Sequence, residues 1–113
     1  MLGGKMRDLT ELNKLEKYLK IHGIPYERTD KEDKYIDEEH KYFLTELERH
    51  QICVPSEMGE REWDVICQRG SYGAEEGLLE IMGTIVSPKA DDTVEGYLTA
   101  KDVIERIEKA GKW

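Results

Sequence analysis

The chain has 113 residues, of which 38% are hydrophobic and 37% are charged, and its formal net charge is −8. A chain of this length most often forms one domain with one core, so we expect a single domain over residues 1–113, with residues 1–7 flexible. The 25 acidic residues outnumber 17 basic ones. This balance argues against direct nucleic-acid binding, because phosphate contacts need clustered Lys and Arg.

The hydropathy pattern gives no indication of a membrane partner. No apolar run approaches the roughly 18 residues that a membrane span needs, and the start, MLGGKMRDLTEL, lacks the apolar centre of a signal peptide. Two cysteines in a chain without an export signal are typical of reduced thiols. The sequence therefore predicts a cytoplasmic protein.

The first predicted element is an amphipathic helix over residues 8–22. Asp8 followed by Glu11 predicts a capping box at its start, with Thr10 as a rival cap. Gly23 suits the left-handed position at its end. Its apolar positions recur every three or four residues: Leu9, Leu12, Leu15 and Leu19.

The next segment gives weaker signals. Residues 24–29 read as a short strand, placed at a sheet edge by Pro25. Residues 30–41 are strongly polar and predict a solvated loop. From Asp37 onward the apolar spacing favours a helix, although a short strand over residues 41–45 fits nearly as well.

Two antiparallel strands are predicted over residues 49–54 and 61–68, joined by a turn that contains proline and glycine. Their apolar faces match when the numbers of paired residues add up to an odd sum, for example 54 with 63, 52 with 65, and 50 with 67. In this register Cys53 and Cys67 lie on opposite faces of the sheet. We therefore predict that they form no disulfide.

Residues 78–86 form a third predicted strand, apolar on both sides as in a central strand covered on both faces. Gly83 within it indicates a bulge or the close approach of another element. A short strand over residues 94–97 and a helix capped by Thr99, with Asp102 at its third position, follow. The fold class is therefore α+β: an antiparallel three- to five-stranded sheet with N-terminal and C-terminal helices packed on one face.

The loop between the strands, residues 70–77, has more glycine than a simple turn needs. Core packing does not explain its composition, and loops often carry binding residues. Tyrosine is enriched among residues that dominate binding, so Tyr72 is the expected anchor. The binding residues proposed from this loop are Arg69, Ser71, Tyr72, Glu75 and Glu76.

Chemistry at single residues is weakly indicated. His50 and Cys67 fall cross-strand on one face, which could form a thiolate–imidazole pair, although an inert buried thiol is the simpler interpretation. Ser71 lies in no GxSxG elbow. His50 and Cys53 have half the spacing of a zinc site but face opposite ways. We predict no catalytic residue, no metal and no cofactor.

An acidic patch is the second candidate binding surface, beside the loop of residues 70–77. Its residues are Asp30, Glu32, Asp33, Asp37, Glu38 and Glu39. Such a segment is usually a solvated surface, but it could also complement a basic groove on a partner. Lys31 and Lys34 dilute that interpretation.

The strings RHQI, WDVICQRGSYGAEEGLLEIMGTIV and VEGYLTAKDVIERI resemble small uncharacterised prophage and mobile-element proteins of Firmicutes. The resemblance implies a bacterial host and supplies no activity. Together with the acidic charge it favours a non-enzymatic protein that binds and inhibits a host protein with a basic surface, such as a defence nuclease (anti-CRISPR-like). Alternatives are a protein that sequesters a small ligand or nucleotide signal, and a small hydrolase that uses Cys67 or Ser71. Homodimer formation stays open.

Overall fold

The structure is a computed structural model that describes residues 7–32, 34–35, 44–46, 48–55, 62–86 and 93–110. A five-stranded antiparallel sheet has the strand order β1-β4-β5-β6-β7, and β2 pairs with β3 in a separate two-stranded sheet. The elements are α1 (Thr10–Ile21), β1 (Glu27–Lys31), β2 (Lys34–Tyr35), β3 (Leu44–Glu46), β4 (Arg49–Val54), β5 (Trp63–Ile66), η1 (Ala74–Glu76), β6 (Leu79–Gly83), β7 (Val94–Leu98) and α2 (Ala100–Ala110).

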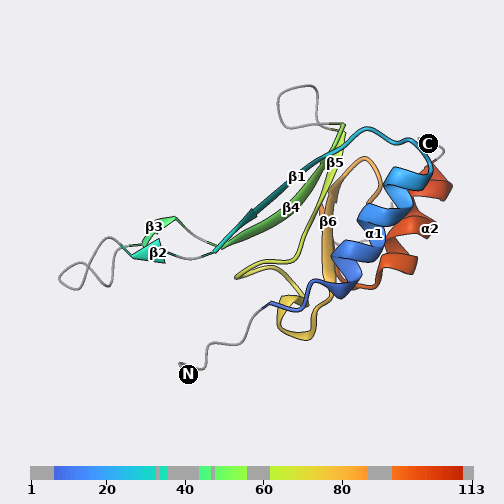
Figure 1. Cartoon of the computed structure of the whole chain (residues 1–113). Coiled ribbons are helices and arrows are strands. Elements are labelled where there is room, and N and C mark those ends of the chain that lie inside the picture. The colour runs from blue at the N-terminus through green and yellow to red at the C-terminus, as the bar shows by residue number, and fades with distance from the viewer. Residues whose placement is uncertain are drawn as a thin grey trace.

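Both α-helices pack side by side on one face of the five-stranded sheet (Figure 1). The predicted α+β class, with an N-terminal and a C-terminal helix on one face of an antiparallel sheet, is therefore confirmed. None of the helices in the described ranges is long and apolar enough to cross a membrane.

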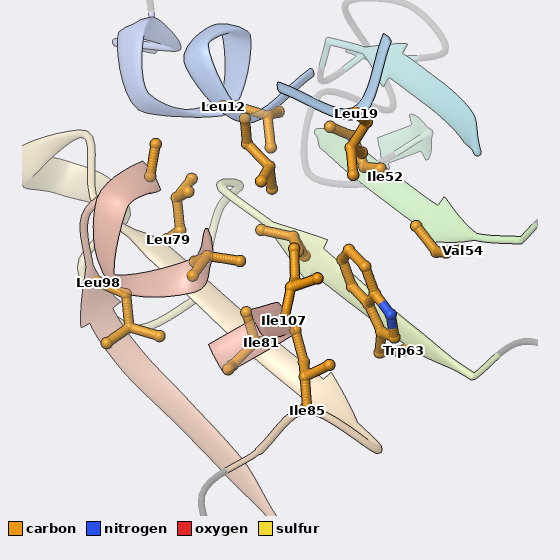
Figure 2. Close-up of a cluster of buried hydrophobic side chains, with 14 of the residues drawn as sticks. Leu12, Leu19, Ile52, Val54, Trp63, Leu79, Ile81, Ile85, Leu98 and Ile107 are labelled. Carbon is orange, nitrogen blue, oxygen red and sulfur yellow. The ribbon is translucent and has the colours of Figure 1, made fainter. Parts of the chain in front are cut away.

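The core lies between the two helices and the inner face of the sheet. Leucines of α1 meet Trp63 of β5 and Ile81 of β6 there, and α2 contributes Ile107 (Figure 2). Each of these side chains is fully buried. Burying a large apolar side chain contributes roughly 1.5–3 kcal/mol, so this cluster is the main source of stability.

The predicted strand register is confirmed. Val54 pairs with Trp63 and Ile52 with Val65, and the Cys67 amide donates to the carbonyl of His50 at 3.0 Å. Both cysteines are buried and neither forms a disulfide. The alternation of apolar residues thus fixed the pairing, since a slip of one residue would move Trp63 out of the core.

Several local predictions were wrong. Residues 44–46 are strand β3, not part of the favoured helix, whose other residues lie largely outside the described ranges. The segment predicted as a polar loop contains the end of β1 and all of β2. β6 is not covered on both faces: Met82 on its outer face is 45% exposed, because the helices occupy only the inner face.

The start of α1 also differs from its prediction. Asp8 accepts a hydrogen bond from the amide of Thr10 at 3.0 Å. Glu11 does not complete a capping box, because its carboxylate accepts from the Ala100 amide at the start of α2 instead. The predicted capping box of α2 is present: Thr99 and Asp102 accept hydrogen bonds from each other's amides at 3.2 and 3.0 Å.

Candidate functional site

A pocket of about 310 Å³ lies at the glycine-rich loop that joins β5 to β6. Residues 69–76 line most of it, and Arg7 and Tyr97 complete the wall. All five binding residues predicted from the loop are therefore lining residues of one pocket. The structure adds two residues from distant parts of the chain, Arg7 and Tyr97.

The loop that forms the pocket folds through left-handed glycines. Gly73 and Gly77 flank the short helix η1 with φ values of 97° and 74°. A Cβ atom at Gly73 would lie 2.9 Å from Cβ of Leu78 and 3.0 Å from Cα of Tyr97. This loop therefore needs glycine both for its backbone angle and for its close contact with β7.

Ser71 has a structural role in the same loop. Its hydroxyl donates to the carbonyl of Gln68 at 2.8 Å and accepts from the amide of Gln68 at 3.0 Å. Both bonds hold the turn, as serine side chains commonly do in loops. The hydroxyl hydrogen is committed to a carbonyl rather than to a general base.

Tyr97 is the most unusual residue of the site. It has a φ of 59° and is the one non-glycine residue with positive φ among those described. It sits in a bulge, because β7 uses three residue steps between Glu95 and Leu98 where β6 uses two between Ile81 and Leu79. A bulge residue in this conformation is usually glycine. An L side chain there is strained by about 1 kcal/mol or more.

Tyr97 and Tyr72 form an exposed aromatic pair. Their ring centroids lie 6.4 Å apart with an interplanar angle of 22°. The two side chains are 59% and 54% exposed. Gly96 makes the arrangement possible, since a Cβ atom there would collide with Cβ of Tyr72. The rings are thus presented to solvent by backbone geometry rather than buried for packing.

The pocket carries both positive and negative side chains, and one of its two arginines is already paired. The Arg7 guanidinium donates to both oxygens of Glu48, at 2.7 and 2.6 Å, and Glu75 adds a further favourable charge interaction. Counting Glu48, three carboxylates stand against the guanidinium groups of Arg7 and Arg69. The positive charge of Arg7 is therefore already compensated.

His50, which belongs to β4, is only 2% exposed. Its Nδ1 is 2.8 Å from Oδ1 of Asp30, and its Nε2 is 3.3 Å from a carboxylate oxygen of Glu32 and from one of Glu48. Two residues of the predicted acidic patch, Asp30 and Glu32, thus face this histidine. The other four patch residues (Asp33, Asp37, Glu38 and Glu39) lie outside the described residues.

Cys67 does not form the proposed pair with His50. Its thiol is fully buried and approaches the carbonyl of Asp8, with a sulfur–oxygen distance of 3.7 Å. Burial raises the pKa of this thiol, and a thiol of raised pKa is a poor nucleophile at neutral pH. Within the described ranges, no cluster of three His, Cys, Asp or Glu side chains could hold a metal ion.

Comparison with known proteins adds no identity. No protein family, curated protein or solved structure matches this chain. The function must therefore be argued from the geometry of the pocket.

Two parts of the site could not have been found from the sequence. Arg7 belongs to a segment predicted to be flexible, and nothing in its neighbours indicates that Glu48, 41 positions away, would hold it. Tyr97 reads as an ordinary strand tyrosine, because a bulge leaves no signal in the alternation of residues. The Gly96-Tyr97 dipeptide is the nearest sequence hint, since glycine inside a strand often marks a close approach.

Proposed function

We propose that this protein is a non-enzymatic binding protein that recognises a partner protein through the pocket that Tyr72 and Tyr97 help to line. The observation that carries the proposal is the backbone of Tyr97. An exposed aromatic ring occupies a bulge position with φ of 59°, where glycine would fold with less strain. The Tyr97 side chain makes no buried core contact that would offset this strain. Binding to a partner therefore explains best why a tyrosine stands at this position.

The chemistry of the two rings supports a protein partner. Tyrosine combines a large apolar area with a hydroxyl group and few rotatable bonds, which is why it is enriched among residues that dominate protein interfaces. The pocket volume of about 310 Å³ is at the lower end of ligand sites. It suits one inserted side chain of a partner better than a large molecule.

The acidic charge of the chain adds a preference for the surface of the partner. A net charge of −8 accelerates association with a basic surface and makes binding sensitive to salt. The resemblance to prophage proteins adds the prediction that the partner is a host protein, with inhibition of a defence nuclease as one form of that function.

The experiment is affinity capture from bacterial lysate at low salt, followed by measurement of the dissociation constant with the captured protein. Tyr72→Ala and Tyr97→Asn should each weaken binding by about tenfold or more, as expected for hot-spot residues. Ile21→Ala is the matched control, because Ile21 is also exposed and apolar but does not line the pocket. Equal binding by all four proteins would contradict the proposal.

A small-ligand binder is the second candidate, because the pocket lies at the loop predicted to hold one. A small-ligand site here would draw its aromatic residues from Tyr72 and Tyr97, since Trp63 is fully buried in the core. Small-molecule pockets are mostly apolar and enclose their ligand, whereas this wall is largely charged side chains and glycine backbone. Thermal stabilisation of the protein by nucleotides, lost in Tyr72→Ala, would favour this candidate.

A further inference from the structure

We infer that the group recognised by this pocket is an arginine side chain of the partner, held against the faces of Tyr72 and Tyr97 with its guanidinium directed at Glu75 and Glu76. This inference rests on the proposed function and gives the bound group a chemical identity. It follows from three properties of the site: the aromatic faces of its wall, the two glutamates of that wall, and the pairing of Arg7 with Glu48, which leaves Arg69 as the other arginine of the wall.

The aromatic pair offers electron-rich faces to solvent. Both rings are more than half exposed and nearly parallel, with an interplanar angle of 22°. A cation that lies over the face of a tyrosine is attracted by the ring quadrupole, by about 0.5–2 kcal/mol depending on solvent exposure. A planar guanidinium can in addition stack flat on a ring, which an ammonium cannot do.

The carboxylates supply the hydrogen-bond acceptors. Glu75 and Glu76 are exposed side chains on η1 and line the same pocket as the two rings. A carboxylate accepts two parallel hydrogen bonds from a guanidinium, and this pairing is both stronger and more directional than a contact with lysine.

The pairing of Arg7 with Glu48 argues against an anion as the bound group. Both oxygens of Glu48 bind the Arg7 guanidinium at 2.6–2.7 Å, so an anion would have to compete with an existing bidentate pair. It would also meet Glu75 and Glu76 across the pocket. The wall itself carries two carboxylates and two guanidinium groups. Glu48, which binds Arg7 from outside the wall, brings the local balance to one excess carboxylate, of the same sign as the net charge of the chain.

The test is an NMR titration of the full-length, ¹⁵N-labelled protein with blocked tripeptides that carry arginine, lysine or glutamate between two glycines. The arginine peptide should give saturable shifts at the amides of Tyr72, Gly73 and Tyr97, with millimolar affinity. We expect the lysine peptide to bind about threefold more weakly. The glutamate peptide should not bind.

The variants separate the two parts of the wall. Tyr97→Asn and Glu76→Gln should each lower the affinity for the arginine peptide by about three- to fivefold. Glu105→Gln is the control, because Glu105 is an exposed acidic side chain of α2 that does not line this pocket, and it should bind as the unchanged protein does.

Two results would overturn the inference: absence of saturable shifts with the arginine peptide, or tighter binding of the glutamate peptide that is lost in Arg69→Gln. These are distinguishable from failure of the proposed function. If partner capture depends on Tyr72 and Tyr97 but the arginine peptide does not bind, the protein-binding function stands and the arginine assignment falls. If capture does not depend on the tyrosines, both fall.

Discussion

The amide of Tyr97 donates a hydrogen bond to the carbonyl of Tyr72 at 3.1 Å, which fastens the glycine-rich loop to the bulge of the last strand. This bond joins residues 25 positions apart and places their side chains in one aromatic pair. The loop and the bulge therefore form a single structural unit, and stability measurements can test how the unit is built.

The first prediction concerns strain at Tyr97. Tyr97→Gly should raise the free energy of unfolding by about 0.5–1 kcal/mol, because relief of the left-handed strain exceeds the extra backbone entropy of glycine. Tyr97→Val should lower it by about 1 kcal/mol or more, since a β-branched residue tolerates this φ poorly. Urea denaturation measures both. If the free energy of unfolding of Tyr97→Gly is lower than that of the unchanged protein by about 1 kcal/mol, Tyr97 is not strained.

The second prediction compares two glycines of the loop. Gly73 and Gly70 both have positive φ, but a Cβ atom would be crowded only at Gly73, since Gly70 has nothing within 4 Å of that position. Gly73→Ala should therefore be more destabilising than Gly70→Ala by about 1–2 kcal/mol. Thermal unfolding of the pair provides the measurement, and Gly70→Ala is the control for the backbone contribution alone. Equal losses would show that the loop can move away from β7.

The third prediction concerns the contact between the two helices. The Glu11 carboxylate of α1 accepts from the Ala100 amide of α2 at 2.7 Å, and so acts as a cap from outside the helix. Glu11→Ala should lower the free energy of unfolding by about 1–2 kcal/mol, and Glu11→Gln by less, because an amide oxygen still accepts.

Glu11 also pairs with Lys14 at 3.5 Å, so the Lys14→Ala variant is needed as a control. An exposed pair of this kind contributes a few tenths of a kcal/mol, and Lys14→Ala should be close to neutral. If Lys14→Ala is as harmful as Glu11→Ala, the cap of α2 is not the main role of Glu11. Denaturant unfolding of all three variants decides between the two roles.

The fourth prediction is a loss of stability in acid. Hydrogen bonds from Arg7 lower the pKa of Glu48. At Asp30, burial acts to raise the pKa, but hydrogen bonds from His50 and Arg28 leave it below its ordinary value. Because the folded-state pKa of each carboxyl is below its unfolded value, the stabilisation is complete above the ordinary carboxyl pKa of about 4 and is lost as pH falls through the folded pKa.

Thermal unfolding between neutral and strongly acidic pH measures this loss. Glu48→Gln should be less stable at neutral pH, by about 1–3 kcal/mol, because Arg7 loses its charged partner. The difference from the unchanged protein should shrink in acid, where Glu48 is protonated. The exposed Glu108 of α2 provides the control variant Glu108→Gln. A difference for Glu48→Gln that stays constant across this pH range would show that its pKa is not lowered by folding.

Sequence reasoning worked where the signal is local. Alternating apolar residues predicted the pairing of Ile52 with Val65 and of Val54 with Trp63, because a slip of one residue would turn one apolar set to the other face of the sheet. Thr99 and Asp102 marked the start of α2 through a capping pattern that needs only four residues. The loop was singled out by its glycines, whose positive φ values require that residue type.

The same reasoning failed where a residue's partner is distant in the chain. Glu11 has the spacing of a capping box, yet it binds an amide 89 positions away. β6 reads as a strand covered on both faces, but both helices pack on one side and leave Met82 exposed. The apolar residues of a strand can be read from the sequence, but the sequence does not show whether a second layer packs on the face that carries them.

The sequence by itself therefore determined β4 and β5 with their register, the start of α2 and the position of the glycine-rich loop, because each depends on near neighbours or on residue alternation. Only the tertiary structure decided what the loop faces. It brought Arg7 to Glu48 and bent β7 so that Tyr97 lies beside Tyr72. A bulge and a long-range ion pair are set by how the chain closes on itself, and no local pattern of residues encodes that closure.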